Sequence, residues 1–375
     1  MTDLATTLAK LARRNTMPNR PFDTADDSGR LHDFDLGEQN PGQLRARIFV
    51  PANLKPGSAL VVVLHGCTQT AADYDEGSGW SRLAEAAGFA LLFPEQQPTN
   101  NQNRCFNWFS PVDQRRGAGE AQSIRTMVAA MVAAHGIDEG RIYITGLSAG
   151  GAMAVTMLAT YPEVFAGGAI IAGLPFGSAR NVADAFARMR GDGHPAPAEL
   201  ASLVRSASSH AGPWPKVSIW QGSADLVVHP SNADQIVGQW LAIHGVDARS
   251  PEYARVDGAS RRRWHGRDGQ PVVESWTIDG MGHGTPVTTR GNDACGIAGP
   301  YMLEAGISST RHIARGWGIA VPAQASAEVP PVSQDRPQVT RLRPMAPPDR
   351  PVKPSTPGSV RTIIEDALRA AGLMR

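Results

Sequence analysis

The sequence predicts an α/β protein built on a mostly parallel, doubly wound sheet with helices on both faces. Its 375 residues contain short apolar runs, such as 59–64 and 89–94, which suit strands that are buried on both faces. Between the runs 89–94 and 141–146, residues 120–135 carry apolar side chains at helical spacing, and this pattern stops at Gly136. Strands that alternate with helices in this way need crossover connections, and these place successive strands parallel.

The expected elements follow one another regularly along the chain. Residues 44–51 alternate apolar and polar side chains, as a half-buried strand does. The later strands are expected at 59–64, 89–94, 141–146, 167–173, 217–222 and 272–280. An excursion between Gly173 and Val217, with a helix near 182–190, either covers a substrate or only connects two strands.

Composition divides the chain into four parts. Residues 1–43 form an N-terminal extension with a short amphipathic helix, and 44–319 form the folded catalytic domain. Residues 320–358 are a Pro-rich linker, and 359–375 form an amphipathic C-terminal helix. Such a helix docks on its own domain, on a second subunit to give a homodimer, or on another partner.

Charge and hydropathy exclude some classes of function. The 36 Lys and Arg residues nearly balance the 35 Asp and Glu residues, so no broad basic face is available for nucleic acid. No apolar stretch approaches the length of a membrane span. The first residues lack an uninterrupted apolar segment of the kind that signal peptides contain, so we expect a cytoplasmic protein.

Cysteine usage points to a reduced protein. Cys67, Cys105 and Cys295 are an odd number in a long chain, unlike a disulfide framework, and reduced or packed thiols are the simplest interpretation. A bridge between Cys67 and Cys105 is the alternative, and it would require an oxidising compartment.

A candidate nucleophile lies in the pentapeptide GLSAG, residues 146–150. The pentapeptide follows the strand RIYIT directly and precedes a helical segment, which is the setting of a nucleophile elbow. Small residues at Gly146 and Gly150 allow the sharp turn that exposes Ser148, and the helix N-terminus favours developing negative charge there. A glycine–serine turn without chemistry is the alternative.

A serine nucleophile needs a base and a group that orients the base. In the α/β-hydrolase fold these residues follow in the order serine, acid, histidine, each after a later strand. Asp225 follows the strand VSIWQ through a glycine turn, and His283 follows ESWTI through glycines. The competing residues, none of them so placed, are His210, His229, His244, His265, His312, Asp234 and Asp257.

The expected oxyanion donors are the backbone N–H groups of Cys67 and Ala149. The fold takes one donor from the residue after the nucleophile and one from the loop after an early strand. His65 and Gly66 begin that early loop, so we expect His65 to organise the turn rather than act as a base. The Cys67 thiol is not expected to be a nucleophile.

Aromatic residues suggest a substrate groove. We expect Trp80, Trp108 and Phe109 to contact substrate, because the segment NRCFNWFSP is too polar and turn-like for a buried strand. The alternative is that these rings, with Phe106, fill the base of the sheet.

Several segments together resemble the esterases related to polyhydroxybutyrate depolymerases, within the α/β-hydrolases. They span about residues 45–317 and include VVVLHGCTQTAADYDEGSGW, NRCFNWF, RIYITGLSAGGAMAV, WQGSADLVVHP and MGHGTPV. The resemblance implies hydrolysis of short-chain acyl, hydroxyalkanoate or feruloyl-type esters through an acyl-enzyme, with polymeric esters as an option. It assigns the chemistry to Ser148, Asp225 and His283, and no metal or organic cofactor is needed.

Two other functions remain open from the residues alone. A peptidase or amidase on the same fold would use the same three residues. A hydrolase-like protein tethered by its C-terminal helix to a granule or partner would require a broken triad, whereas all three positions are filled.

Overall fold

The computed structural model describes residues 30–35 and 39–320. The predicted N-terminal helix, the Pro-rich linker beyond residue 320 and the predicted C-terminal helix lie outside the described residues. Within the described part of the chain, no helix is both long and apolar enough to cross a bilayer.

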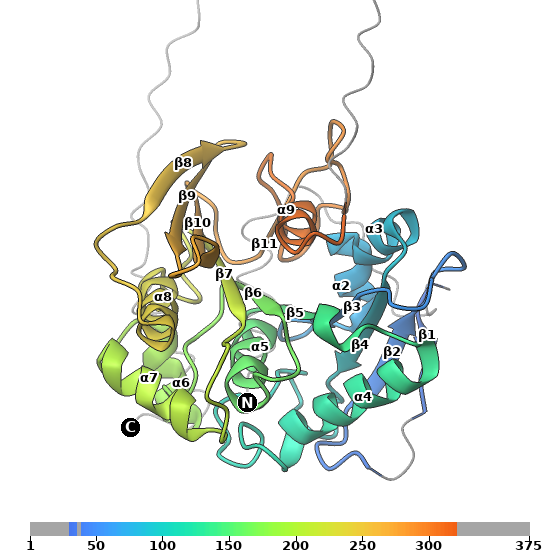
Figure 1. Ribbon diagram of the computed structural model, residues 1–375, viewed down its shortest axis with the longest axis horizontal. Helices are drawn as coiled ribbons and strands as arrows, with labels where there is room; N and C mark the ends of the chain where they lie inside the picture. Colours follow the sequence, from blue (N-terminus) through green and yellow to red (C-terminus); the bar gives the residue numbers. More distant parts are fainter. Residues whose placement is uncertain (1–29, 36–38, 321–375) are drawn as a thin grey trace, which may run out of the picture. The chain divides into compact units, whose positions relative to one another are not determined.

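A ten-stranded sheet forms the centre of the fold, with the strand order β1-β2-β4-β3-β5-β6-β7-β10-β9-β8 (Figure 1). The strands from β4 to β10 in this order run parallel, which confirms the predicted mostly parallel sheet. Its strands are β1 (His32–Asp33), β2 (Arg45–Phe49), β3 (Leu60–Leu64), β4 (Ala90–Glu95), β5 (Ile142–Leu147), β6 (Gly167–Ile171), β7 (Lys216–Gly222), β8 (Glu252–Val256), β9 (Ala259–His265) and β10 (Pro271–Ile278). Two short strands, β11 (Thr285–Val287) and β12 (Met302–Glu304), pair separately.

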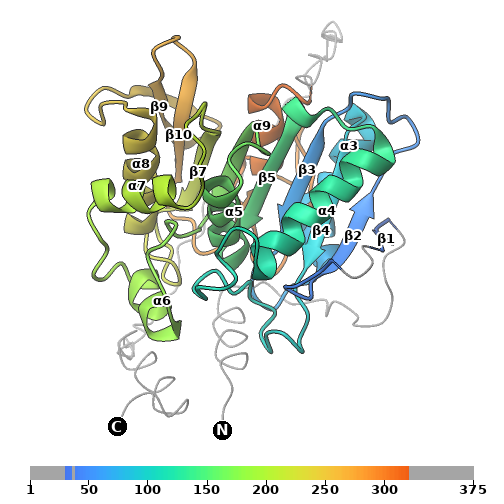
Figure 2. The same ribbon diagram turned by 60° about the horizontal axis from the view of Figure 1, so that its bottom comes forward.

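Helices cover both faces of the sheet (Figures 1 and 2). One layer contains α4 (Gly119–His135), α5 (Ala149–Thr160), α7 (Pro197–Ser206) and α8 (Ser231–His244). The other contains α2 (Ala71–Ser78), α3 (Trp80–Ala87) and α9 (Ser309–Gly316). A short α6 (Val182–Met189) lies in the excursion before α7, and a 3₁₀ turn, Glu139–Arg141, precedes β5.

The central strand β3 explains why two cores form. Its five residues are all fully buried, with Leu60, Val62 and Leu64 in one hydrophobic cluster and Val61 and Val63 in the other. Successive side chains of a strand point to opposite faces, so a continuously apolar strand supplies both layers at once.

The helix stop predicted at Gly136 is confirmed. This glycine has a φ of 61°, and its N–H donates to the carbonyl of Val132, closing the last turn of α4. Glycine adopts this left-handed conformation at little steric cost, so it ends the helix where a larger residue would be strained.

The structure contains elements that the sequence-based prediction lacked. The hairpin β8–β9 was not anticipated, and it adds antiparallel strands beside β10. The excursion contains α7 as well as α6, and Gln239 of α8 donates to the carbonyl of Leu200 in α7, so α7 packs against α8.

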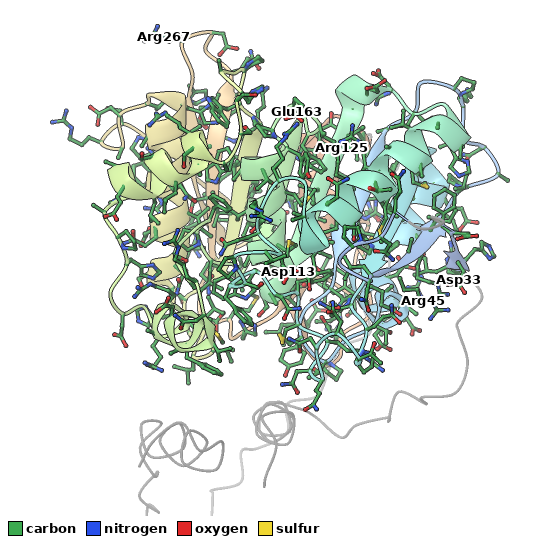
Figure 3. The ribbon with its side chains drawn as sticks, turned by 90° about the horizontal axis from the view of Figure 1, so that it is seen from below. Asp33, Arg45, Asp113, Arg125, Glu163 and Arg267 are labelled. Carbon is green, nitrogen blue, oxygen red and sulfur yellow. A yellow bond between two sulfur atoms is a disulfide. The ribbon has the colours of Figure 1, made fainter. Side chains whose placement is uncertain are left out.

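The first part of the sheet begins earlier than expected. Strand β1 lies inside the predicted N-terminal extension, yet it pairs with β2, with His32 opposite Ile48. Asp33 and Arg45 form an ion pair of 2.7 Å across these strands (Figure 3). Arg45 lowers the pKa of the Asp33 carboxyl, but both side chains are exposed, so the pair contributes at most about 1 kcal/mol.

Candidate active site

Ser148 occupies a sharp turn between β5 and α5. Its φ of 57° and ψ of −117° are unusual for a residue with a side chain, and its N–H donates to the carbonyl of Ile171 at 2.9 Å. A Cβ on Gly146 would lie 2.4 Å from the Gly150 carbonyl oxygen, and one on Gly150 would lie 2.5 Å from the His65 carbonyl oxygen. The two glycines are therefore required by close backbone contacts, and they place Ser148 at the carboxyl edge of the sheet.

Asp225 is held rigidly at the end of β7. It is 1% exposed, and its Oδ1 accepts hydrogen bonds from the backbone N–H groups of Val227 and Val228, both at 2.9 Å. Its Oδ2 accepts one from the Gln221 side chain at 2.9 Å and lies 2.8 Å from His283 Nδ1. These three donors fix the orientation of the Asp225 carboxylate independently of His283.

His283 lies on the turn after β10, which neighbours β7 in the sheet. The turn is joined to the Asp225 loop because Gly280 N–H donates to Ser223 Oγ at 2.8 Å and Ala224 N–H donates to the Met281 carbonyl at 3.0 Å. Since Asp225 accepts the hydrogen bond from Nδ1, the other ring nitrogen of His283 is left as an acceptor.

The structure brings two of the three predicted side chains into direct contact. Asp225 and His283 are hydrogen-bonded, and Ser148 follows β5 at the same edge of the sheet. Among the described residues no hydrogen bond joins the Ser148 hydroxyl to His283, so that contact stays a prediction.

The loop after β3 is organised by His65, as the sequence suggested. His65 Nε2 accepts the Gln96 N–H at 3.1 Å, so its Nδ1 carries the proton and donates to the Gly66 carbonyl at 2.8 Å. Burial lowers the pKa of His65, which keeps the ring neutral. Within the described part of the chain, the N–H groups of Cys67 and Ala149 donate to no protein acceptor, so both are free for an oxyanion.

Cys67 and Cys105 form a disulfide, whereas Cys295 is a free, buried thiol. The expectation of three reduced thiols is therefore wrong for two of them. The bridge joins the loop after β3 to the loop between β4 and α4, and the Thr68 N–H strengthens this junction by donating to the Asn103 carbonyl at 2.7 Å.

Glu120 is a structural centre that sequence reasoning missed. It is fully buried, and its carboxyl group accepts hydrogen bonds from the Gln96 side chain at 2.6 Å and from the Asn107 side chain and backbone at 2.7 and 2.8 Å. Burial, with a contribution from Asp113, raises the pKa of Glu120 to about 8. The only sequence signal was an acidic residue at the start of an apolar helix.

The predicted substrate contact by Trp80 is corrected. Trp80 is 1% exposed and packs against Phe89 and Trp317, with ring centroids 6.3 and 6.1 Å apart, in the core beneath α3. Trp108 is also largely buried, and Phe109 meets it edge to face at 5.8 Å with part of its ring exposed. For these two residues a contact with substrate stays a prediction.

A second histidine–carboxylate pair lies between α9 and the β8–β9 turn. His312 Nε2 is 2.8 Å from Asp257, and the ring packs against Trp276 at 5.2 Å. Asp293 lies nearby, but both of its carboxylate oxygens bind Arg315. His312, Asp257 and Asp293 therefore all have protein partners, and we interpret them as a structural cluster.

Comparison with known proteins agrees with this arrangement. Residues 47–263 match the family model described as esterase PHB depolymerase. The chain is 46% identical over 282 residues to poly(3-hydroxyalkanoate) depolymerase C of Paucimonas lemoignei, a match that covers 75% of this chain and 68% of that protein. It is 32% identical over 260 residues to acetylxylan esterase A of Emericella nidulans, covering 66% and 83% of the two chains.

A solved structure extends the likeness to the fold. The acetyl xylan esterase from Aspergillus awamori superposes with a TM-score of 0.66 at 25% identity, covering 78% of this chain and all of that one. With the sheet order, the elbow at Ser148 and the Asp225–His283 pair, these matches show that the chain belongs to the esterase PHB depolymerase family and is a carboxylic-ester hydrolase of the α/β-hydrolase fold.

Proposed function

We propose that Ser148, Asp225 and His283 form a catalytic triad that cleaves esters through an acyl-enzyme. The observation that supports this most directly is the 2.8 Å hydrogen bond between His283 Nδ1 and a carboxylate held by three further N–H donors. This bond fixes the tautomer in which Nε2 can accept a proton. The elbow at Ser148 supplies a hydroxyl at the same sheet edge.

In the proposed reaction, His283 takes the Ser148 proton while Oγ attacks the ester carbonyl carbon. The N–H groups of Cys67 and Ala149 then stabilise the tetrahedral oxyanion. When the intermediate collapses, the alcohol leaves with the proton from His283 and an acyl-enzyme remains. Water, deprotonated by His283, attacks the acyl carbon. As the bond from that carbon to Oγ breaks, His283 returns the proton to Ser148 Oγ and the carboxylic acid leaves.

For substrate, we propose short-chain and hydroxyalkanoate esters, including polymeric ones. The support is the 46% identity to a protein named poly(3-hydroxyalkanoate) depolymerase C. The test is hydrolysis of p-nitrophenyl esters from acetate to palmitate, and of a poly(3-hydroxybutyrate) suspension, by wild type and by Ser148→Ala. Loss of all activity in the variant supports the nucleophile, and clearing of the suspension by wild type supports the polymer. A Ser148→Ala protein with wild-type activity would overturn the triad.

A second substrate class is acetylated polysaccharide. It is favoured by the TM-score of 0.66 with an acetyl xylan esterase, which covers the whole of that protein. The test compares the rates at which acetate is released from acetylated xylan and hydroxybutyrate from the polymer, at equal ester concentration. Faster release of acetate would favour acetylated polysaccharide over the hydroxyalkanoate.

The cytoplasmic location stays a prediction. The Cys67–Cys105 disulfide favours an oxidising compartment instead, because protein disulfides persist outside reducing cytosol. Cell fractionation, with thiol titration of protein isolated under alkylating conditions, distinguishes the two locations.

A further inference from the structure

Tyr301 occupies a backbone conformation that normally belongs to glycine. Gly299 and Met302 exchange both backbone hydrogen bonds at 3.0 Å, so Pro300 and Tyr301 form the middle of a tight turn. With proline in the second place of such a turn and a positive φ in the third, glycine is the usual third residue. Here Tyr301 has a φ of 61°. A bulky residue held in this region indicates that its side chain is needed where the turn places it.

The ring of Tyr301 lies against His283. The two ring centroids are 6.1 Å apart with an interplanar angle of 80°, an edge-to-face contact. The backbone meets the same loop, because the Thr285 N–H donates to the Tyr301 carbonyl at 2.7 Å. A Cβ on Gly284 would lie 2.6 Å from that carbonyl oxygen, so the two segments are packed in close contact beside His283.

The other end of Tyr301 reaches the loop that carries Cys67. Burial raises the pKa of its phenol, and the nearby Thr68 side chain lowers it. Thr68 also has a positive φ, of 66°, and its hydroxyl donates to the Cys67 carbonyl at 2.6 Å. The Tyr301 side chain thus contacts His283 and ends near the residue that follows Cys67.

We propose that Tyr301 is a positioning residue for ester hydrolysis, which bridges His283 and the Cys67–Thr68 loop. This inference rests on the proposed triad and oxyanion donors. Asp225 holds the His283 ring only at Nδ1, so the imidazole can still tilt about the line that joins this nitrogen to Cβ. The ring of Tyr301 restricts this rotation, and Nε2 therefore stays directed at the Ser148 hydroxyl and then at the leaving alcohol. The hydroxyl of Tyr301 holds Thr68, and through it the Cys67 N–H, at a constant distance from His283.

The test compares Tyr301→Leu and Tyr301→Phe in the full chain, with Tyr253→Leu as a matched control. Tyr253 is 74% exposed on β8, the last strand at the far edge of the sheet, beyond β9 and β10. With p-nitrophenyl butyrate we expect Tyr301→Leu to lower kcat about tenfold or more while KM changes less than twofold, because misdirected catalytic groups slow the chemical step. Tyr301→Phe keeps the ring, and we expect it to recover most of this loss, leaving kcat about threefold below wild type.

Other outcomes overturn the assignment. Wild-type kcat in Tyr301→Leu removes the positioning role, and a rise in KM that accounts for the whole loss makes Tyr301 a substrate contact instead. If Tyr301→Phe is as slow as Tyr301→Leu and both variants melt at the wild-type temperature, the loss of kcat does not come from the lost ring contact with His283. Ser148→Ala distinguishes failure of the positioning role from failure of the proposed triad. If Ser148→Ala is inactive and Tyr301→Leu has wild-type kcat, only the role of Tyr301 is wrong. If Ser148→Ala is active, both the triad and the positioning role are wrong.

Discussion

Part of the backbone strain in this protein lies at the proposed site. Three of its non-glycine residues with positive φ are Thr68, Ser148 and Tyr301, at 66°, 57° and 61°. Each is held by hydrogen bonds to a neighbouring segment, such as the bond from Ser148 N–H to Ile171. Strained conformations persist only where the surrounding structure over-determines them, so the backbone at these three positions is held in place by protein contacts alone.

Site residues could be predicted where the fold fixes their order along the chain. They could not be predicted where their role depends on how separate segments pack together. Ser148, Asp225 and His283 each follow a strand through a glycine turn, and that pattern is visible in the sequence. The roles of Glu120 and Tyr301 depend on contacts between distant segments, which no local pattern encodes. Trp80 was misplaced for the same reason, because the face of α3 that is buried depends on what packs against it.

The buried carboxyl of Glu120 predicts a pH-dependent stability. Its pKa is about 8 in the folded protein against 4.5 for the ordinary side chain. The folded state therefore holds a proton that the unfolded state releases, and the resulting stabilisation, fully present below pH 4.5, is lost as pH rises through about 8. Compared with Glu120→Gln, the wild-type unfolding free energy should fall by about 1.4 kcal/mol per pH unit between these limits.

Urea unfolding of both proteins at pH 5, 6, 7 and 8 checks this expectation. Because glutamine does not titrate, the variant removes the contribution of Glu120 and leaves those of the other groups. Different absolute stabilities are expected, since the amide changes the contacts with Gln96 and Asn107. Parallel pH profiles would show that the carboxyl is ionised throughout the range.

Among the elements, the parallel strands were predicted well and the antiparallel hairpin was not. Strands β3 and β4 are buried on both faces, so their sequences are continuously apolar. Strand β9 carries Arg261, Arg262 and Arg263, a run that reads as solvent-exposed loop. It is a strand through its backbone pairing with β8 and β10, and Arg263 also binds Glu274 of β10 at 2.6 Å. Partners on another strand cannot be assigned from the sequence alone.

Because a disulfide holds the loop that carries Cys67, we expect the activity of the enzyme to be sensitive to reduction. Breaking the Cys67–Cys105 bridge frees this loop from the segment before α4, so we expect kcat for p-nitrophenyl butyrate to fall about tenfold as the oxyanion donor loses its fixed position. The closed loop is of moderate length, and its loss should cost about 2–4 kcal/mol of unfolding free energy.

The measurement is activity and melting temperature before and after incubation with dithiothreitol. The Cys67→Ser, Cys105→Ser double variant should match the reduced wild type and should not respond to the reductant. Equal kcat in the oxidised and reduced proteins would mean that the Thr68–Asn103 hydrogen bond and the Glu120 contacts suffice to hold the loop.

At the scale of the whole molecule, the position of the site follows from the strand order. Residues Ser148, Asp225 and His283 follow β5, β7 and β10, and these strands lie in one parallel block with β6. Their carboxyl ends meet at one edge of the sheet, where a doubly wound fold places its ligands. The catalytic region could therefore be predicted once the strands were recognised, and so could helix α6 of the excursion, although α7 could not.

The same view of the whole molecule predicts that residues 30–320 are sufficient for ester hydrolysis. Both hydrophobic clusters, strand β1 with its pairing to β2, and every residue proposed for catalysis lie in this range. A chain cut to 30–320 should melt within a few degrees of the full chain and keep its kcat/KM for p-nitrophenyl butyrate within about twofold, because it retains all of these contacts. A cut at residue 44 is the informative comparison. It removes β1 and exposes the edge of β2, including Arg47, which is 3% exposed and donates to the Leu31 carbonyl, so a lower melting temperature is expected. If instead the 30–320 chain lost activity while the full chain kept it, the ends would take part in forming the site.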